Sequence, residues 1–326
     1  MCTQAVTVID LRSVPAFDQG HVPGSISAPL DAENPAPKRQ HLNPAIRQHL
    51  SIQAASWREK YETLCLEKQP VVLLCADGMV ASPFVYDILS PVIPDALSVF
   101  EGGYRGYRKR VRSLFRKPCR FVLLRGKTGS GKSALLQLLQ QNGYRVLDLE
   151  GLSGSRGSAF GRVGEVSPQP THEHFENLIA GTLCQLQSDE PIFVEEELHP
   201  LGHCVVPESL QRQMQNGFKV YLDVPPETRA DALVEQYGGI DDAGVIDGIR
   251  RLAGRIGQEQ CDRLIEATER GEYHKVAREL LAYYDNASGY ESSASDADVV
   301  ISGDNVQALY NTLTGDVFTR LAAREP

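Results

Sequence analysis

Three features are missing from this 326-residue sequence, and each absence argues against a class of protein. No apolar run is long enough to cross a bilayer, so we predict no membrane partner. The first residues, Met1 to Asp10, lack a basic segment followed by a long apolar stretch, so we expect no signal peptide and a cytoplasmic location. The odd number of cysteines and the lack of a CxxC pair argue against a disulfide framework or a zinc knuckle. The cysteines stand at positions 2, 65, 75, 119, 184, 204 and 261.

The charge balance is acidic overall and basic in one place. The formal net charge of -9 is unfavourable for a nucleic-acid partner, yet eight of the sixteen residues from Arg105 to Arg120 are Arg or Lys. A local basic stripe can bind phosphates even on an acidic protein. The same stripe is also typical of a solvated helix face. The candidate RNA contacts are Arg105, Arg108, Lys109 and Arg112.

Short apolar runs that alternate with helical periodicity favour α/β folds. In the first part, residues 5–10 and 71–74 predict buried strands, and residues 57–66 predict a helix. A further helix is predicted over 83–89, with Ser82 as its N-cap. Strands that alternate with helices imply a mainly parallel sheet covered on both faces.

A second α/β unit is predicted from about Pro118. Its expected strands are residues 121–124, 144–148, 191–194 and 218–223, and the pattern from 230 to 284 is mostly helical. We therefore predict two domains, residues 1–117 and residues 118–326, the second with a helical C-terminal part.

Cys75 stands where the apolar run 71–74 passes into a short loop and then into a helix. Backbone N–H groups of such a loop point at the sulfur, favour the thiolate and stabilise a bound anion. A thiolate is a nucleophile that can carry a sulfane sulfur or a selenium atom. By itself a cysteine at a strand end is more often buried and inert.

Three segments around this cysteine resemble the rhodanese family. Residues 8–12 with 17–26 resemble its first strand and following turn, and residues 100–104 resemble its closing segment. The resemblance covers about residues 5–110. It implies a rhodanese-like domain with Cys75 at the persulfide-forming position.

Residues 126–133 fit the phosphate-loop pattern G-x-x-x-x-G-K-[ST] and stand between a predicted strand and a predicted helix. In such a loop consecutive N–H groups wrap a phosphate chain, the lysine adds positive charge and the final hydroxyl holds Mg²⁺. Glu195, after an apolar run, could be a metal-linked acid or part of a solvated acidic turn. The phosphate-binding candidates are Gly126, Gly129, Ser130, Gly131, Lys132 and Ser133.

Residues 148–152 and 156–161 closely resemble the tRNA 2-selenouridine synthase family, in which a rhodanese domain is fused to a P-loop domain. Further matches follow in order at 175–177, 195–207 and 283–285, so the likeness spans nearly the whole chain. The candidate residues of the P-loop domain are Asp148, Glu150, Arg156, Gly157, Ser158 and Glu195.

This resemblance implies a transferase that converts 2-thiouridine at the wobble position of tRNA into 2-selenouridine through a geranylated intermediate. Geranyl diphosphate would supply the geranyl group and selenophosphate the selenium, which Cys75 would carry. The implied partners are tRNA and a selenophosphate-supplying synthetase. Mg²⁺ is the one ion expected with the phosphates, and we predict no resident metal site and no tightly bound cofactor.

The cysteine loop departs from the family pattern C-x-R-G-G-x-R-S, because Asp77 and Ala81 stand in place of its arginines. Those arginines would bind the anionic selenium donor, whereas a carboxylate disfavours a nearby thiolate. Two alternatives stay open. One is a divergent paralogue that keeps the P-loop, tRNA binding or geranyl transfer without selenation. The other is a P-loop NTPase or kinase with a degenerate rhodanese module.

Overall fold

The chain divides into two compact units in a computed structural model. The structure describes residues 6–29, 70–79, 81–91, 97–155, 168–186, 190–196, 200–239, 241–286, 294–317 and 320. The helix predicted over 57–66 lies outside these residues. The first unit comprises Met1–Lys117 and Thr171–Gln185, and the second comprises Pro118–Pro170 and Leu186–Pro326. Residues 171–185, which the sequence analysis assigns to the second domain, thus belong to the first unit.

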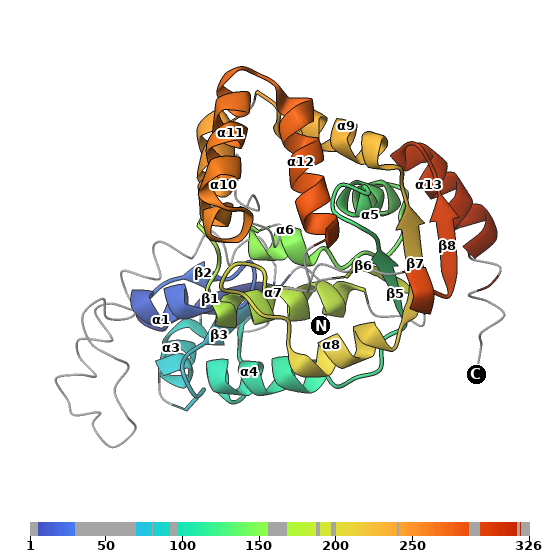
Figure 1. The fold of residues 1–326 in the computed structure, drawn as a ribbon. Coiled ribbons are helices and arrows are strands. Elements are labelled where there is room, and N and C mark those ends of the chain that lie inside the picture. The colour runs from blue at the N-terminus through green and yellow to red at the C-terminus, as the bar shows by residue number, and fades with distance from the viewer. Residues whose placement is uncertain are drawn as a thin grey trace. The chain divides into compact units, whose positions relative to one another are not determined.

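A parallel sheet in the order β2-β1-β3-β4 forms the centre of the first unit (Figure 1). Its strands are β1 (Thr7–Asp10), β2 (Ile26–Ser27), β3 (Val71–Leu74) and β4 (Leu97–Val99). All four residues of β3 are buried, as in a parallel strand that is covered on both faces. A short helix, α1 (Val14–Gln19), follows β1.

Helices cover both faces of this first sheet. The helix α3 (Ala81–Leu89) packs Val85 and Leu89 against one face, and α4 (Gly103–Leu114) packs Tyr104 against the other. Helix α7 (His172–Gln185), which comes from far along the chain, packs on α4. The prediction of a parallel sheet covered on both faces is confirmed.

The second unit contains another parallel sheet, in the order β6-β5-β7-β8. Its strands are β5 (Phe121–Arg125), β6 (Ile192–Glu195), β7 (Phe218–Asp223) and β8 (Val299–Ser302). The strand predicted over 144–148 is wrong. Only Val146 makes a bridge, to Phe193 on β6, because the chain turns directly into α6 (Leu149–Ser153).

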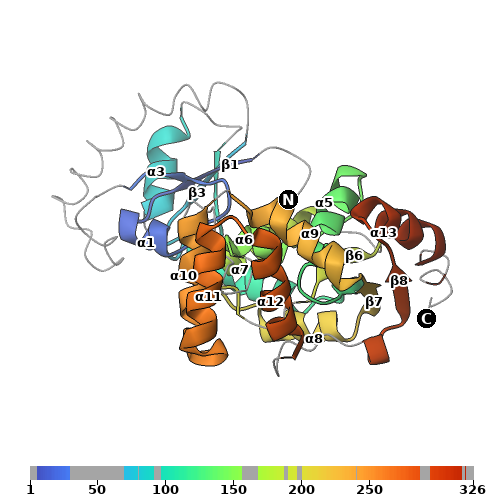
Figure 2. The ribbon, with the colours of Figure 1, turned by 45° about the horizontal axis from the view of Figure 1, so that its top comes forward.

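One face of this sheet packs on α5 (Lys132–Gln141) and α13 (Val306–Thr312), and Figure 2 shows α13 beside β8. The leucines Leu135, Leu136 and Leu139 of α5 recur at helical spacing and are all buried in this core. Helix α8 (Glu208–Gln215) packs against β5. The phosphate-loop strand is therefore held from both sides.

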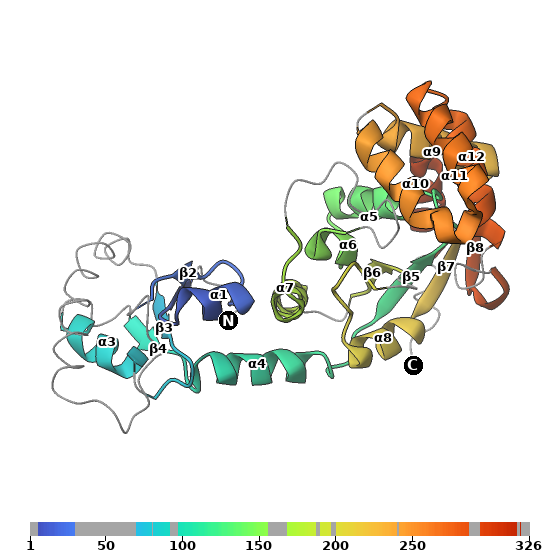
Figure 3. The same ribbon diagram turned by 60° about the vertical axis from the view of Figure 1, so that its left-hand side comes forward.

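The remaining helices form a cluster with a core of its own (Figure 3). They are α9 (Pro226–Tyr237), α10 (Asp242–Ile256), α11 (Gln258–Glu269) and α12 (Tyr273–Asn286). Buried residues such as Ile249, Leu264 and Leu280 join α10, α11 and α12. This cluster confirms the predicted helical part of the second domain. Among the described residues, no helix is both long and apolar enough to cross a membrane.

Candidate functional site

The phosphate loop connects β5 to α5, as the motif predicts. Gly129 and Gly131 have φ angles of +77° and +81°, a left-handed conformation that glycine adopts without steric cost. Gly131 caps the N-terminus of α5, where unpaired N–H groups favour an anion. The Lys132 amine donates a hydrogen bond to the Gly126 carbonyl at 2.9 Å, so its charge lies over the loop. The loop therefore has the donors and the charge that a phosphate requires.

Two carboxylates meet at the final hydroxyl of this loop. The Ser133 hydroxyl lies 3.1 Å from an oxygen of Glu150, on α6, and 3.1 Å from an oxygen of Glu195, at the end of β6. The register of the sheet explains the position of Glu195, because it pairs with Leu124 on the strand that leads into the loop. Hydroxyl and carboxylate oxygens are the ligands that Mg²⁺ prefers. Ser133, Glu150 and Glu195 would hold this ion beside a phosphate.

Burial and the nearby Glu150 charge together raise the pKa of Glu195 to about 8. The side chain is only 2% exposed, and its Oε1 atom has no hydrogen-bond partner among the described residues. Such a buried oxygen costs free energy until a ligand pairs with it. A divalent cation at this carboxylate would supply that partner and displace the proton.

The other candidates of the P-loop domain have different positions. Asp148 is the N-cap of α6, where its carboxylate accepts a hydrogen bond from the Gly151 N–H at 2.8 Å. It contributes to the negative field around Glu195. Ser130 is buried, and within the described part of the chain its hydroxyl has no hydrogen-bond partner. The candidates Arg156, Gly157 and Ser158 lie outside the described residues.

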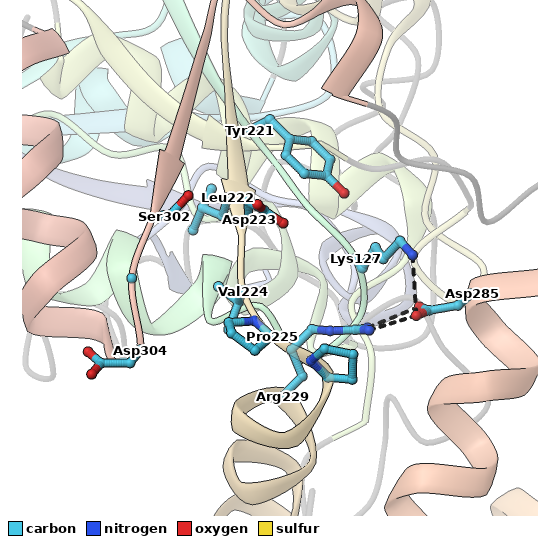
Figure 4. A pocket seen from close by; sticks show the side chains of 12 residues that line it. Lys127, Tyr221, Leu222, Asp223, Val224, Pro225, Arg229, Asp285, Ser302 and Asp304 are labelled. Carbon is cyan, nitrogen blue, oxygen red and sulfur yellow. Dashed lines mark hydrogen bonds and ion pairs between the residues drawn. The ribbon is translucent and has the colours of Figure 1, made fainter.

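A cavity of about 660 Å³ whose lining includes charged residues adjoins the phosphate loop at the carboxyl ends of β7 and β8 (Figure 4). Arg229, at 2% exposure, donates to both oxygens of Asp285 at 3.0 and 2.6 Å and to the Thr128 carbonyl at 3.1 Å. Lys127 also contacts Asp285, at 3.3 Å. Arg229 thus links α9 and α12 to the loop. Sequence reasoning missed it, although the match at 283–285 includes its partner.

In the first unit, Cys75 follows β3 and its thiol accepts two hydrogen bonds. The Gly78 N–H donates to the sulfur at 3.2 Å and the Ser82 hydroxyl donates at 2.9 Å. Both donors are uncharged. The side chain is only 2% exposed, so an incoming reactant needs movement of the loop. The prediction of Ser82 as an N-cap is wrong, because α3 begins at Ala81 and the hydroxyl is used at the sulfur.

The start of α4 holds the cysteine loop in place. The N–H groups of Tyr104 and Arg105 donate to the carbonyls of Cys75 and Ala76, at 2.7 and 3.1 Å. A side chain at Gly103 would collide with this loop, with the Cys75 carbonyl 2.3 Å from the added Cβ. Gly103 of the segment 100–104 thus permits the close approach.

Asp77 and Ala81 stand where the resemblance leads us to expect arginines, and the loop 75–82 contains no Lys or Arg. The carboxylate of Asp77 accepts a hydrogen bond from the Met79 N–H at 3.0 Å. Ala81 is buried at the start of α3. The resemblance segment 8–12 has a structural role, since Arg12 pairs with the buried Asp10 at 2.6 Å and stacks over the Tyr104 ring.

One of the four candidate RNA contacts, Arg108, is buried in the described structure. Arg108 is 7% exposed, and its guanidinium donates to Asn177 and Glu176 on α7. It therefore holds α7 on α4 and does not face solvent. Arg105, Lys109 and Arg112 are exposed on α4, at the spacing of one helix face.

Two domain families match this chain, and together they define its class: a rhodanese-like domain followed by a P-loop α/β domain. Residues 1–110 match the rhodanese-like domain, and residues 119–246 match the tRNA 2-selenouridine synthase AAA domain. A tRNA 2-selenouridine synthase from Nitrosomonas europaea is 30% identical over 246 residues. The alignment covers 71% of this chain and 63% of that relative. The chain belongs to the tRNA 2-selenouridine synthase family.

Two kinases are among the solved structures that match part of this chain. The shikimate kinase from Aquifex aeolicus is 15% identical with a TM-score of 0.27, and the match covers 62% of this chain and 98% of that one. The gluconokinase from Sinorhizobium meliloti is 13% identical with a TM-score of 0.29, and the match covers 64% of this chain and 99% of that one.

Proposed function

We propose that this protein is a transferase that replaces the sulfur of 2-thiouridine in tRNA with selenium through a geranylated intermediate. The observation that carries the proposal is the presence, in one chain of this family, of two reactive loops. One is a phosphate loop whose Ser133 contacts two carboxylates, and the other is a cysteine loop whose thiol has two hydrogen-bond donors. Each loop suits one half of the reaction.

The phosphate loop suits the geranyl-transfer half. The thiocarbonyl sulfur attacks the first carbon of geranyl diphosphate, the carbon–oxygen bond breaks, and diphosphate leaves with the electron pair. The uracil ring then loses its N3 proton, which leaves a neutral S-geranyl base. Lys132 and the N-terminus of α5 would stabilise the departing diphosphate. Mg²⁺ at Ser133, Glu150 and Glu195 would neutralise its charge.

The cysteine loop suits the selenium half. The selenium atom of selenophosphate, held at the Cys75 loop, attacks carbon 2 of the geranylated base, and the carbon–sulfur bond breaks with loss of geranylthiol. Water then cleaves the selenium–phosphorus bond, so that phosphate leaves and selenium stays on the base. The prior alkylation matters because an alkylthiolate is a better leaving group than the unmodified sulfur. The Gly78 N–H and the Ser82 hydroxyl would stabilise negative charge on the sulfur during the transfer. The selenium donor would be selenophosphate, supplied by a separate synthetase.

The exposed basic residues of α4 would bind the tRNA backbone. Arg105, Lys109 and Arg112 lie on one helix face, where they are exposed to solvent. Arginine and lysine bind phosphates without reading the base sequence. This helix would position the substrate, and base recognition would come from other parts of the protein.

A second candidate function is favoured by the cysteine loop itself, where the charged residue of the described part is Asp77 rather than an arginine. A loop of this kind attracts an anionic selenium donor poorly. The second candidate is therefore a geranyl transferase that leaves the thiouridine geranylated and never selenated.

One experiment tests both candidates. Purified protein is incubated with 2-thiouridine-containing tRNA, geranyl diphosphate and Mg²⁺, with or without selenophosphate, and the nucleosides are identified by mass spectrometry. The proposal predicts the geranylated nucleoside without selenophosphate and 2-selenouridine with it. The geranylated nucleoside under both conditions would establish the second candidate, and an unchanged 2-thiouridine would reject both.

A further inference from the structure

A second cavity opens at the phosphate loop, and its lining is apolar. It lies among α9, α10 and α12, and Thr128 of the loop forms part of its wall. Of the described residues that line it, none is Lys, Arg, Asp or Glu, in contrast to the cavity that contains Arg229 and Asp285. Its volume is about 90 Å³, several times the ~10–15 Å³ that one buried water requires. An apolar cavity of this size suits an apolar ligand better than a chain of waters.

The loop is fixed against the wall of this cavity. A side-chain carbon added at Gly129 would lie 3.3 Å from the Leu233 side chain, and Leu233 lines the cavity. The hydrogen bond from Arg229 to the Thr128 carbonyl holds the same part of the loop on α9. A ligand whose phosphates occupy the loop therefore has an apolar space directly beside them.

We infer that this cavity holds the isoprenoid chain of a prenyl diphosphate whose diphosphate lies in the phosphate loop. The inference rests on the proposed geranyl transfer, and it adds the place where the chain binds and the residues that set its length. Lys132 and the N-terminus of α5 match the anionic end of such a ligand. Leu233, Val276, Ala277 and Leu280 match its hydrocarbon end. Each methylene removed from water favours binding.

Binding measurements on the full chain test this inference without depending on catalysis. Isothermal titration with Mg²⁺ compares geranyl diphosphate with inorganic diphosphate. Wild-type protein should bind geranyl diphosphate at least ~10-fold more tightly, with a more negative heat-capacity change, because the chain leaves water. Equal dissociation constants for the two ligands, or no binding of geranyl diphosphate, would overturn the inference.

Filling the cavity should remove that advantage. Ala277 is a small, buried residue of the lining, so Ala277→Leu adds volume inside the cavity. Ala282→Leu is the matched control, since Ala282 lies on the same helix and is exposed. Ala277→Leu should weaken the binding of geranyl diphosphate at least ~10-fold and leave the binding of inorganic diphosphate unchanged. Ala282→Leu should change the binding of neither ligand. Unaltered geranyl diphosphate binding by a folded Ala277→Leu variant would contradict the inference.

An enlarging variant covers the case in which Ala277→Leu fails to fold. Leu280→Ala lengthens the space, so the dissociation constant of farnesyl diphosphate relative to geranyl diphosphate should fall at least ~5-fold. An unchanged ratio would count against the inference. If ATP binds the wild-type protein and Ala277→Leu weakens ATP binding, the cavity belongs to a nucleotide base and the inference is overturned. If these ligands bind as expected but no geranylated nucleoside forms, the proposed function fails while the chain site stands.

Discussion

The cysteine loop after β3 and the phosphate loop after β5 occupy the same place in their sheets. Each follows an inner strand of a parallel sheet and leads into a helix, α3 in one case and α5 in the other. The carboxyl ends of parallel strands are the usual place for ligands in such folds. The shared topology explains why both loops can present a reactive group.

The two loops differ in charge. The phosphate loop brings Lys132 together with Glu150 and Glu195, so it combines a cation with metal-binding oxygens. Among the residues that the structure describes, the donors to the sulfur of the cysteine loop are uncharged, and the loop's own charged residue is Asp77. The comparison teaches that topology supplies the position, while side-chain charge decides which anion each loop can use.

The largest effect is expected at the cation of the phosphate loop. Lys132→Ala removes the charge that would stabilise the departing diphosphate, so kcat/KM for geranyl transfer should fall by ~100- to 1000-fold. The rate of S-geranyl-2-thiouridine formation measures it. Lys127→Ala is the control, because that exposed lysine of the same loop directs its side chain to Asp285, and its effect should stay below ~10-fold. A similar loss in both variants would contradict a special role for Lys132.

The next effect separates the structural arginine Arg108 from Arg112, which is proposed to bind RNA. Arg108→Met leaves Glu176 and Glu173 without their buried partner and should destabilise the protein by about 2–3 kcal/mol, less than the ~3–5 kcal/mol of a fully buried pair. Arg112→Met should cost under ~0.5 kcal/mol. It should, however, reduce the salt slope of tRNA binding by about 1.

Urea titration and tRNA binding at several salt concentrations measure these two quantities. A stable Arg108→Met variant with a reduced salt slope would show that Arg108 faces the RNA after all. That result would restore the original prediction for this residue.

A smaller effect concerns the buried acid beside the phosphate loop. The pKa of Glu195 is about 8 in the folded protein and its ordinary value is 4.5, so the folded state retains a proton that the unfolded state has lost between these values. The resulting stabilisation is full below pH 4.5 and is lost as the pH rises through about 8. Glu195→Gln should therefore flatten this decline and raise the melting temperature at pH 8 by about 2–4 °C.

Thermal melts of the metal-free protein from pH 5 to 9 measure this difference. Parallel curves for wild type and Glu195→Gln would indicate that Glu195 is already ionised at neutral pH. Glu208→Gln is a suitable control, because Glu208 is an exposed carboxylate on α8.

The smallest effect is expected when the cysteine loop is given a positive charge like that of the phosphate loop. Asp77→Arg exchanges a negative charge for a positive one near Cys75, so the KM for selenophosphate should fall about threefold to tenfold. Asp77→Asn removes the negative charge alone and should give an intermediate value. Initial rates of 2-selenouridine formation measure it, and a KM that does not change with charge at position 77 would break the comparison.

Features that depend on neighbouring residues in sequence were predictable. The strands β3 and β5, the phosphate loop and the place of Cys75 each follow from a contiguous pattern of apolar and glycine residues. Val146 shows the limit of this approach. Its surroundings read as a strand, but the Asp148 cap starts a helix two residues later and leaves a single bridge.

Features that depend on distant partners were not predictable. Arg108 stands in a basic run, and only the packing of α7 shows that it meets Glu176 and Asn177. Arg229 likewise stands in an ordinary helical pattern, and its value to the site comes from Asp285 and the Thr128 carbonyl. A sequence motif identifies a loop, whereas the residues that hold the loop in place come from other parts of the chain.

The proposed separate roles of the two loops, geranyl transfer at the phosphate loop and selenation at the cysteine loop, are tested most directly by supplying the geranylated intermediate. Lys132→Ala, Cys75→Ser and wild-type protein are each given tRNA that already carries S-geranyl-2-thiouridine, together with selenophosphate. The account predicts that Lys132→Ala forms 2-selenouridine at nearly the wild-type rate and that Cys75→Ser forms none. Selenation by Cys75→Ser at the wild-type rate, or its complete loss in a folded Lys132→Ala variant, would contradict the account.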